Sequence, residues 1–364
     1  MARVMVAMSG GVDSSVAAAL LKEAGHEVVG VTMRLGPDAC LEETPKACCG
    51  PDAVHDAARV AEAIGIALYP LNLRRNFQEL VIGPFCDEYA VGRTPNPCVL
   101  CNRELKFGHL LRLALAQDFD YVATGHYAII ERSEAEGRFQ LRRAAMKQWD
   151  QSYFLYSLDQ FQMAHTIFPI GGMSKDEARQ VARRFGLPVS EKPGSQDICF
   201  LSGGDYRPFL AERRPELCVE GPIVTSDGKR IGTHDGCAFY TVGQRTGLGV
   251  ATGERVYILA LRPDTNTVVV GPKEEAQMTR VRVENVAWTG RDAPDVPMRL
   301  GVKVRYRQRD AEAVVEVVGN GVAEVGFDEA QLPSAPGQAA VFYDGEVVAG
   351  GGVIVSSNLS DDYA

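Results

Sequence analysis

Residues 9–15 read Ser-Gly-Gly-Val-Asp-Ser-Ser, a set of residue types that can hold a phosphate group. An apolar run from Val4 to Met8 precedes them and an alanine-rich segment follows, which predicts a strand, a glycine loop and a helix. Glycines let backbone N–H groups approach an anion, and the helix start adds its own N–H groups and dipole. Asp13 adds a carboxylate that can bridge to a metal ion. We therefore predict an anion site rather than a glycine turn with a serine N-cap.

A first reactive cysteine is predicted in the proline-rich stretch Thr94-Pro-Asn-Pro-Cys98-Val-Leu-Cys101. We expect a helix from Asn102 to about Gln117, with Asn102 as its cap and Cys101 at its N-terminus. The helix dipole at that end favours the thiolate form of Cys101. This matters because an ordinary thiol is only a few per cent ionised at neutral pH.

A second polar loop, Ser195-Gln-Asp-Ile-Cys199-Phe, holds another cysteine and is flanked by glycines. Its polar neighbours make Cys199 a poor candidate for a small buried apolar residue. A structural zinc site is the alternative for these cysteines, with Cys98 and Cys101 completed by Cys48-Cys49 or by Cys199.

The composition limits the classes of protein to which the chain can belong. Its 364 residues suggest two or three domains. There is no apolar run of bilayer length and no export signal, so we expect a cytoplasmic protein without a membrane partner. The nine cysteines are then not expected to form a disulfide framework. The net charge of −9 argues against a general nucleic-acid binder, but it allows an enzyme that grips RNA through local basic patches.

Residues 1–202 are predicted to form an α/β domain, because strand and helix patterns alternate along them. We expect a parallel sheet with helices on both faces. The expected strands are 3–8, 27–33, 67–71 and 121–124, and the expected helices are 14–24, 51–64 and one opened by the capping box Ser174-Lys-Asp-Glu177.

After residue 203 the pattern changes to short β-rich segments separated by turn dipeptides. We predict a small β-rich middle domain over residues 203–280 and a C-terminal β-barrel over residues 281–364, of which 357–364 form a disordered acidic tail. The turn dipeptides are Asp227-Gly228, Asp235-Gly236, Asn320-Gly321 and Asp344-Gly345.

The ordered set of loops resembles a known family. Residues 9–15 lack the lysine of the kinase and GTPase loop, and they resemble the SGG-x-D-S loop of ATP pyrophosphatases, which have the adenine nucleotide α hydrolase-like fold. With the two cysteine loops, nearly the whole chain resembles the bacterial tRNA-specific 2-thiouridylases. The further motifs that carry this resemblance are Ala123-Thr-Gly-His126-Tyr127, Asp150-Gln-Ser-Tyr-Phe154, Tyr240-Thr-Val-Gly-Gln-Arg245, Arg305-Tyr-Arg-Gln308 and Pro336-Gly-Gln338.

The resemblance implies a sulfurtransferase that uses ATP and Mg²⁺ to adenylate the C2 oxygen of the wobble uridine in certain tRNAs. A persulfide on Cys199, loaded by a sulfur-relay protein or a cysteine desulfurase, would deliver sulfur to C2. Cys101 would be the nucleophile: it releases sulfur and ends in a Cys101–Cys199 disulfide, or it first attacks the base. The two thiols can bond only if the fold brings their Cα atoms within about 7 Å.

The resemblance also assigns site residues by position. The ATP site would comprise Ala7, Met8, Ser9, Gly10, Gly11, Val12, Asp13, Ser14, Met33 and Gly125. The target base would contact Asn96, Pro97 and Cys98, and the tRNA would contact His126, Trp149, Asp150, Gln151, Arg305, Tyr306 and Gln338. Basic residues at positions 303, 305, 307 and 309 alternate, which predicts a strand with one cationic face.

The chain departs from the family pattern at two positions. Many relatives have an aspartate where this chain has Cys98, so the proton transfer attributed to that aspartate falls to another group or follows another mechanism. Relatives often have a lysine directly before Asp150-Gln151. This chain has Trp149 there, which can stack on a base or pack inside the protein.

Three alternatives stay open from the sequence. Cys98, Cys101 and Cys199 could hold an iron–sulfur cluster with an open iron site for hydrosulfide, which changes the sulfur carrier but not the product. A small-molecule adenylating ligase, such as argininosuccinate, GMP or NAD synthetase, has the same loop but needs neither two reactive cysteines nor a basic barrel strand. A non-catalytic ATP-binding sulfur carrier would bind ATP without releasing pyrophosphate.

Overall fold

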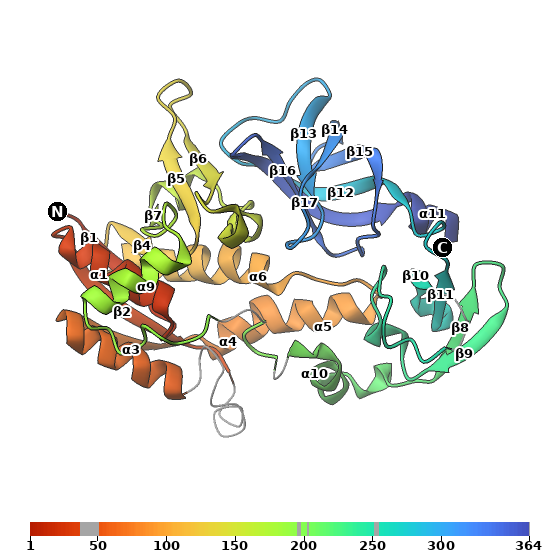
Figure 1. Ribbon diagram of the computed structural model, residues 1–364, viewed down its shortest axis with the longest axis horizontal. Coiled ribbons are helices and arrows are strands. Elements are labelled where there is room, and N and C mark those ends of the chain that lie inside the picture. The colour runs from red at the N-terminus through yellow and green to blue at the C-terminus, as the bar shows by residue number, and fades with distance from the viewer. Residues whose placement is uncertain (37–50, 195–197, 202–203, 251–254, 364) are drawn as a thin grey trace. The chain divides into compact units, whose positions relative to one another are not determined.

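The structure is a computed structural model that describes residues 1–36, 51–194, 198–201, 204–250 and 255–363 (Figure 1). The chain separates into two compact units. The first unit consists of Met1–Ile82, Pro97–Asp205 and Glu346–Val348. The second unit consists of Gly83–Asn96, Tyr206–Gly345 and Ala349–Ala364. Within the described ranges, no helix has the length and apolar character needed to span a bilayer.

The first unit is built on a five-stranded parallel sheet, which confirms the predicted α/β class. The strands are β1 (Arg3–Ala7), β2 (Glu27–Arg34), β3 (Ala67–Asn72), β4 (Tyr121–Ala123) and β7 (Thr166–Ile167). They lie in the order β3-β2-β1-β4-β7. The chain thus leaves β1 toward one edge of the sheet and later returns on its other side at β4. Such a reversal opens a crevice beyond the carboxyl ends of the two central strands.

Helices pack against the side chains on the faces of the sheet. α1 (Val12–Glu23) contacts β1 and β2, and it packs against α3 (Pro51–Ile64) and α9 (Lys175–Arg184). α7 (Leu111–Leu115) contacts β4 on the connection that returns across the sheet. Because crossovers between parallel strands are right-handed, this connection and the α1–α3 layer lie on opposite faces, as predicted.

Two longer helical stretches change pitch along their length. The first runs through α4 (Arg74–Phe77), the π-helical η1 (Gln78–Ile82) and α5 (Gly83–Ala90), which belongs to the second unit. The second runs through α6 (Pro97–Leu100), the π-helical η2 (Cys101–Leu110) and α7. The helix start predicted at Asn102 is therefore wrong. The helix begins at Pro97 because proline suits the first helical position, where its missing N–H leaves no bond unmade.

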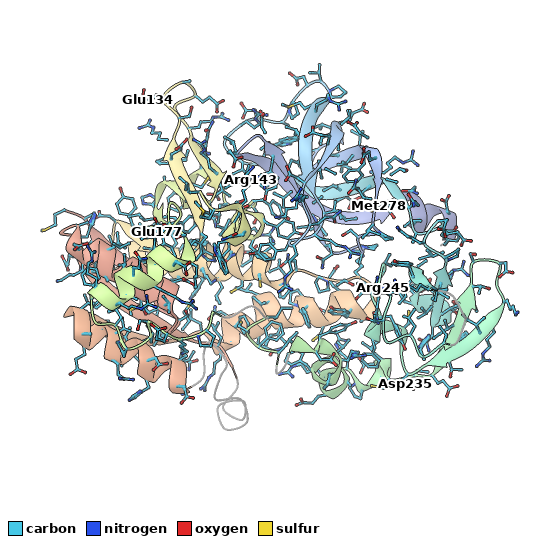
Figure 2. The ribbon with its side chains drawn as sticks, viewed as in Figure 1. Glu134, Arg143, Glu177, Asp235, Arg245 and Met278 are labelled. Carbon is cyan, nitrogen blue, oxygen red and sulfur yellow. The ribbon has the colours of Figure 1, made fainter. Side chains whose placement is uncertain are left out.

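A hairpin and short helices complete the first unit. β5 (Ala128–Arg132) and β6 (Phe139–Arg143) pair antiparallel, with Glu134 at the tip of the hairpin and Arg143 at its base (Figure 2). The following segment forms the 3₁₀ turns η3 (Lys147–Trp149) and η4 (Ser152–Phe154), then α8 (Gln160–Ala164). The capping box predicted at the start of α9 is confirmed, because the side chains of Ser174 and Glu177 each bond the other's backbone N–H.

The middle part of the second unit is a four-stranded sheet, preceded by α10 (Tyr206–Arg213) and the 3₁₀ turn η6 (Pro215–Leu217). Its strands are β8 (Gly221–Thr225), β9 (Arg230–His234), β10 (Tyr257–Arg262) and β11 (Thr267–Gly271), in the order β10-β11-β8-β9. Ile223, Ile258, Val268 and Val270 are fully buried between them and form a separate core.

The C-terminal part of the second unit is the predicted antiparallel barrel. Its strands are β12 (Met278–Trp288), β13 (Met298–Lys303), β14 (Ala311–Gly319), β15 (Val322–Gln331), β16 (Ala339–Asp344) and β17 (Val347–Ser357). They follow the order β12-β15-β14-β13-β16-β17, and β12 also pairs with β17, so the sheet closes on itself. Alternate side chains such as Val281, Val315 and Phe342 fill the interior.

The turn dipeptides were predicted correctly at three of four positions. Asp227-Gly228 joins β8 to β9, Asn320-Gly321 joins β14 to β15, and Asp344-Gly345 joins β16 to β17. Asp235-Gly236 does not join two strands: it leads from β9 into the 3₁₀ turn η7 (Cys237–Phe239). There the side chain of His234 accepts a hydrogen bond from the Gly236 N–H at 3.0 Å, which turns the chain away from the sheet.

The prediction of a disordered acidic tail is wrong. Residues Asn358–Tyr363 form the short helix α11. The Asn358 side chain accepts hydrogen bonds from the backbone N–H groups of Thr279 and Arg280, and Leu359 is buried in the barrel core. An apolar anchor and an asparagine at the start of the segment outweigh its acidic composition.

Candidate nucleotide and thiol site

The predicted phosphate loop follows β1 and leads directly into α1. Gly10 adopts a positive φ of 68°, and a Cβ at this position would lie 2.9 Å from the carbonyl carbon of Ala53 in α3. Only glycine therefore lets the loop lie this close to α3. The Ser14 hydroxyl accepts a hydrogen bond from the Ser9 N–H at 3.1 Å, and the Ser15 hydroxyl donates to the Gly11 carbonyl at 2.7 Å. The two serines thus fix the shape of the loop.

The N-terminus of α1 faces the crevice of the sheet. Its N-cap, Gly11, supplies no side-chain hydrogen bond to the helix, so the first-turn N–H groups can bind an anion. Gly125, just after β4, lies against the same turn: a Cβ there would be 2.5 Å from the carbonyl carbon of Asp13. The end of β4 and the start of α1 are therefore in direct backbone contact at the point where nucleotides bind in such sheets.

The carboxylate of Asp13 has two side-chain partners from other parts of the first unit. The Lys175 ammonium lies 2.6 Å from each of its oxygens, and the Tyr127 hydroxyl donates to it at 2.8 Å. Lys175 and Tyr127 are not among the site residues predicted from the sequence. A signal for Lys175 was present, because a lysine directly after the N-cap Ser174 opposes the helix dipole and suggests a partner elsewhere.

Two further basic side chains lie close to the loop. The Lys192 ammonium donates to the Gly10 carbonyl at 3.0 Å and pairs with Asp56 of α3 at 2.7 Å. Arg179 follows Lys175 by one helical turn, and its Nε is buried without a hydrogen-bond partner among the described residues. Two lysines therefore contact the loop, and each of them is paired with a carboxylate.

The predicted nucleotide residues in the sheet are mostly buried. Ala7 and Met8 end β1, and the Met8 N–H bonds the Val31 carbonyl at 2.8 Å. Met33 lies near the end of β2 and is partly exposed. Met33 is thus an apolar side chain at the carboxyl end of β2, the strand next to β1.

Cys98 and Cys101 lie one turn apart on the helix that begins at Pro97. Cys101 is 8% exposed, and burial raises its pKa. Burial and the neighbouring Cys101 raise the pKa of Cys98 to about 11, while the positive charge of Lys106 lowers both values. The expectation that the helix dipole favours a Cys101 thiolate is therefore wrong. Cys101 stands inside the helix, where desolvation of the charged form outweighs the dipole.

Asn102 lies inside this helix and does not cap it, and its side chain makes two hydrogen bonds. Its amide donates to the Phe154 carbonyl at 3.0 Å, and its side-chain oxygen accepts from the Lys106 ammonium at 3.0 Å. Lys106 is thereby held on the face of the helix that carries the two cysteines.

Cys199 lies in a turn closed by a 3.0 Å hydrogen bond from the Leu201 N–H to the Ile198 carbonyl. The next residue, Phe200, packs edge-on against Phe77 of α4 at 5.6 Å. The stretch α4–η1 packs in turn against α6–η2, the helix with Cys98 and Cys101. Both predicted sulfur-handling cysteines thus belong to the first unit, and both are free thiols.

Some residues that the sequence predictions name lie outside the described residues. These are Cys48 and Cys49, which are the alternative zinc ligands, and Ser195, Gln196 and Asp197, which are the polar neighbours of Cys199. Among the residues that the structure does describe, no three His, Cys, Asp or Glu side chains gather to hold a metal ion. Cys98, Cys101 and Cys199 are all described and do not form such a group.

His126 and the segment after the hairpin lie close to the nucleotide loop. The His126 Nδ1 lies 2.6 Å from the Thr124 hydroxyl, and its ring contacts Phe107 and Phe168. Burial, with a smaller effect from Lys106, holds the pKa of His126 well below its usual value. The ring is therefore neutral at physiological pH and can act as a hydrogen-bond donor or acceptor.

Residues 149–151 pack and form hydrogen bonds within the first unit. Trp149 is partly buried and packs against the core of the sheet. Asp150 is 3% exposed, and its carboxylate accepts hydrogen bonds from the Ala144 and Ser152 N–H groups. Gln151 exchanges hydrogen bonds with the Tyr127 backbone, so this segment fixes the residue that binds Asp13.

The remaining predicted tRNA residues lie in the second unit. Gln338 donates to the Thr94 carbonyl at 2.8 Å, and the Thr94 N–H donates to the Pro336 carbonyl at 2.7 Å. Residues 94–96 are therefore bound to the barrel segment around Gln338. The Arg305 guanidinium donates to the Pro333 carbonyl of the same segment.

The strand predicted over positions 303–309 is wrong. β13 ends at Lys303, and the Gln308 N–H bonds the Arg305 carbonyl at 3.2 Å in a turn. Lys303 is buried, with its ammonium 5.5 Å from the centre of the Tyr306 ring. The basic side chains at positions 303, 305, 307 and 309 therefore do not line one face of a strand, because the chain turns after the end of β13.

The parallel sheet, the glycine loop at its reversal point and the charged side chains around it define a nucleotide-binding α/β enzyme domain. A family model described as a tRNA methyl transferase HUP domain matches residues 2–203. Models described as a tRNA methyl transferase PRC-barrel domain and an aminomethyltransferase beta-barrel domain match residues 207–272 and 278–354.

Curated relatives cover almost the whole chain. The tRNA-specific 2-thiouridylase of Halothermothrix orenii is 46% identical over 97% of this chain and 99% of its own length. Those of Heliobacterium modesticaldum and Clostridioides difficile are 48% and 43% identical, over 97% and 98% of this chain and 92% and 98% of their own lengths. The chain belongs to the tRNA-specific 2-thiouridylase family.

Proposed function

We propose that the protein uses ATP to replace the C2 oxygen of the wobble uridine in tRNA by sulfur. The uridine O2 attacks the α-phosphorus of ATP and pyrophosphate leaves. Sulfur then adds to C2, and AMP leaves with the former O2. The observation that carries this proposal is that the phosphate loop and two free cysteines, Cys101 and Cys199, belong to one unit.

In this proposal the sulfur is the outer atom of a persulfide on Cys199. The Cys101 thiolate attacks the inner sulfur of Cys199 as the sulfane sulfur bonds to C2, which leaves a Cys101–Cys199 disulfide. A Cys101 attack on the base is the other order of events. The raised pKa of Cys101 means that its proton must be removed at the site, and Lys106 is the described cation that stabilises the resulting thiolate.

ATP would bind along Ala7–Ser14, Met33 and Gly125, with the polyphosphate at the start of α1. Asp13 and the Ser14 hydroxyl are the hard oxygen donors that Mg²⁺ prefers, so the loop fits this ion. Mg²⁺, when bound, would neutralise charge on the phosphates during displacement. Gly11 and the first turn of α1 would bind the same phosphates through backbone N–H groups.

The tRNA would contact Asn96, Pro97 and Cys98 at the base. Further contacts would come from His126, Trp149, Asp150, Gln151, Arg305, Tyr306 and Gln338. Of these, Asp150 and Gln338 would act by holding neighbouring backbone, because their side chains already bond it. Cys98, with a pKa of about 11, would serve as a proton donor and not as the base that an aspartate provides.

The sulfur donor in this proposal is a sulfur-relay protein or a cysteine desulfurase in the cytoplasm. The iron–sulfur alternative requires Cys98, Cys101 and Cys199 to gather around one cluster. Anaerobic purification followed by iron and sulfide analysis would test it, and a stoichiometric cluster would replace the persulfide step.

Mass spectrometry of tRNA nucleosides after incubation with the pure protein, ATP, Mg²⁺ and a sulfur source tests the function directly. We expect 2-thiouridine and tRNA-dependent pyrophosphate release. A methylated nucleoside would instead support the chemistry named in the family-model descriptions. Pyrophosphate release with a small molecule and without tRNA would indicate an adenylating ligase, and ATP binding without release would indicate a carrier.

A further inference from the structure

Lys175 is a buried cation at a helix N-terminus, which is an unfavourable position for a positive charge. It stands in the first turn of α9, where the positive end of the helix dipole disfavours a cation. Its side chain is 9% exposed, and its ammonium contacts both oxygens of Asp13 at 2.6 Å. A buried ammonium without an anionic partner is strongly destabilised, so Lys175 must remain paired in every state of the site.

Asp13 is also the carboxylate that the loop can offer to a divalent cation. A carboxylate can bind a metal ion and an ammonium at once, but a divalent cation on one Asp13 oxygen would repel the Lys175 ammonium and weaken the pair in this partly buried site. An anionic phosphate oxygen close to Asp13 would then be the better partner for Lys175. Asp13 lies in the first turn of α1, where the polyphosphate is expected, and a flexible lysine stem can redirect its three N–H donors over a short distance.

We propose that Lys175 is a binding residue of the nucleotide site: it holds Asp13 in position and then pairs with the pyrophosphate part of ATP. The inference rests on the proposed function and assigns it a new residue. The Lys175 ammonium would move from the Asp13 carboxylate to the departing phosphates, so the charge of the buried cation stays compensated throughout. No covalent bond to Lys175 forms or breaks.

The surroundings of the pair support this role. The Tyr127 hydroxyl donates to Asp13, and burial together with Asp13 raises the pKa of Tyr127, so it stays protonated and keeps Asp13 oriented. Its ring lies 5.7 Å from the Lys175 ammonium. Arg179, on the same side of α9, has a buried Nε without a hydrogen-bond partner within the described ranges, and it would add a second donor for phosphate oxygens.

The test compares pyrophosphate and AMP binding to the full chain by isothermal titration calorimetry with Mg²⁺ present. Lys175→Met removes the charge, Lys175→Arg keeps it, and Lys22→Met removes an exposed lysine at the far end of α1 as the matched control. We expect Lys175→Met to weaken pyrophosphate binding at least about tenfold, the value of one charge-assisted hydrogen bond. AMP binding should change by less than about twofold, Lys175→Arg should recover part of the loss, and Lys22→Met should match the wild type.

Thermal unfolding shows whether each variant is folded. Should Lys175→Met fail to fold, Lys175→Gln carries the same comparison, since its amide can still bond Asp13. Unchanged pyrophosphate affinity in a folded Met or Gln variant would overturn the inference, as would an equal loss of AMP and pyrophosphate. A wild type that binds neither ligand would overturn the nucleotide site of the proposed function itself, which separates the two failures.

Discussion

At Gly125 we expect a single added methyl group to impair the proposed nucleotide site while the protein stays folded. In Gly125→Ala the new Cβ would lie 2.4 Å from the backbone nitrogen of Ser14 and 2.5 Å from the carbonyl carbon of Asp13. Ordinary contact begins at 3.4 Å, so the backbone at Asp13 and Ser14 would have to move by about 1 Å. These neighbours are backbone atoms of α1, which cannot rotate away as a side chain can.

A shift of this size has two expected consequences. Overpacking of this kind costs about 1–3 kcal/mol of folding free energy. A displacement near 1 Å of groups that position a reacting ligand can lower the rate by about a hundredfold. We therefore expect kcat/KM for tRNA-dependent pyrophosphate release to fall about a hundredfold while the protein stays folded.

Pyrophosphate release at several ATP concentrations, together with thermal unfolding, provides the measurement. Gly172→Ala is the control, because a Cβ there meets no atom within 4 Å. Wild-type ATP binding and release in Gly125→Ala would refute the argument that the two backbones touch at the nucleotide. A loss of stability without any loss of release would place the contact away from the phosphates.

Three further predictions concern the thiols and their helix. Cys199→Ser should keep tRNA-dependent pyrophosphate release but yield no 2-thiouridine by mass spectrometry; normal product would remove Cys199 from sulfur delivery. Lys106→Met should raise the pKa of Cys101 further, because it removes the positive charge that lowers it, so the pH profile of Cys101 alkylation should move to higher pH and return in Lys106→Arg. An unmoved profile would show that Lys106 does not act on the thiol. Asn102→Ala should cost about 1–3 kcal/mol in urea unfolding, because it removes the partly buried hydrogen bond from the Asn102 amide to the Phe154 carbonyl, and a neutral effect would contradict this.

Local chemistry made the strand, loop and helix of the phosphate site predictable. An apolar run, two glycines and an alanine-rich segment are specified within a few residues of each other, and the structure places β1, the loop and α1 there. The capping box at Ser174 and three glycine turns were predictable for the same reason. Each of these features depends on hydrogen bonds between near neighbours in the chain.

Several predictions failed because the side chain has a partner elsewhere in the chain. Asn102 looked like a cap, but it lies inside the helix that begins at Pro97, and its amide bonds Phe154, 52 residues away. The tail looked disordered, but Asn358 and Leu359 find partners in the barrel. The basic positions after Lys303 alternate as in a strand, yet the chain turns there.

The sequence by itself determined the residue types of the site: a phosphate loop with its carboxylate, and two cysteines in polar loops. Only the tertiary structure decided which groups surround them, namely Lys175 and Tyr127 on Asp13, and Lys106 on the face of the cysteine helix. The physical reason is that the charge state of a group depends on its burial and on the charges within a few ångströms. Around Asp13 both are set by segments that the fold brings together, because Tyr127 and Lys175 lie 114 and 162 residues away from it in the sequence.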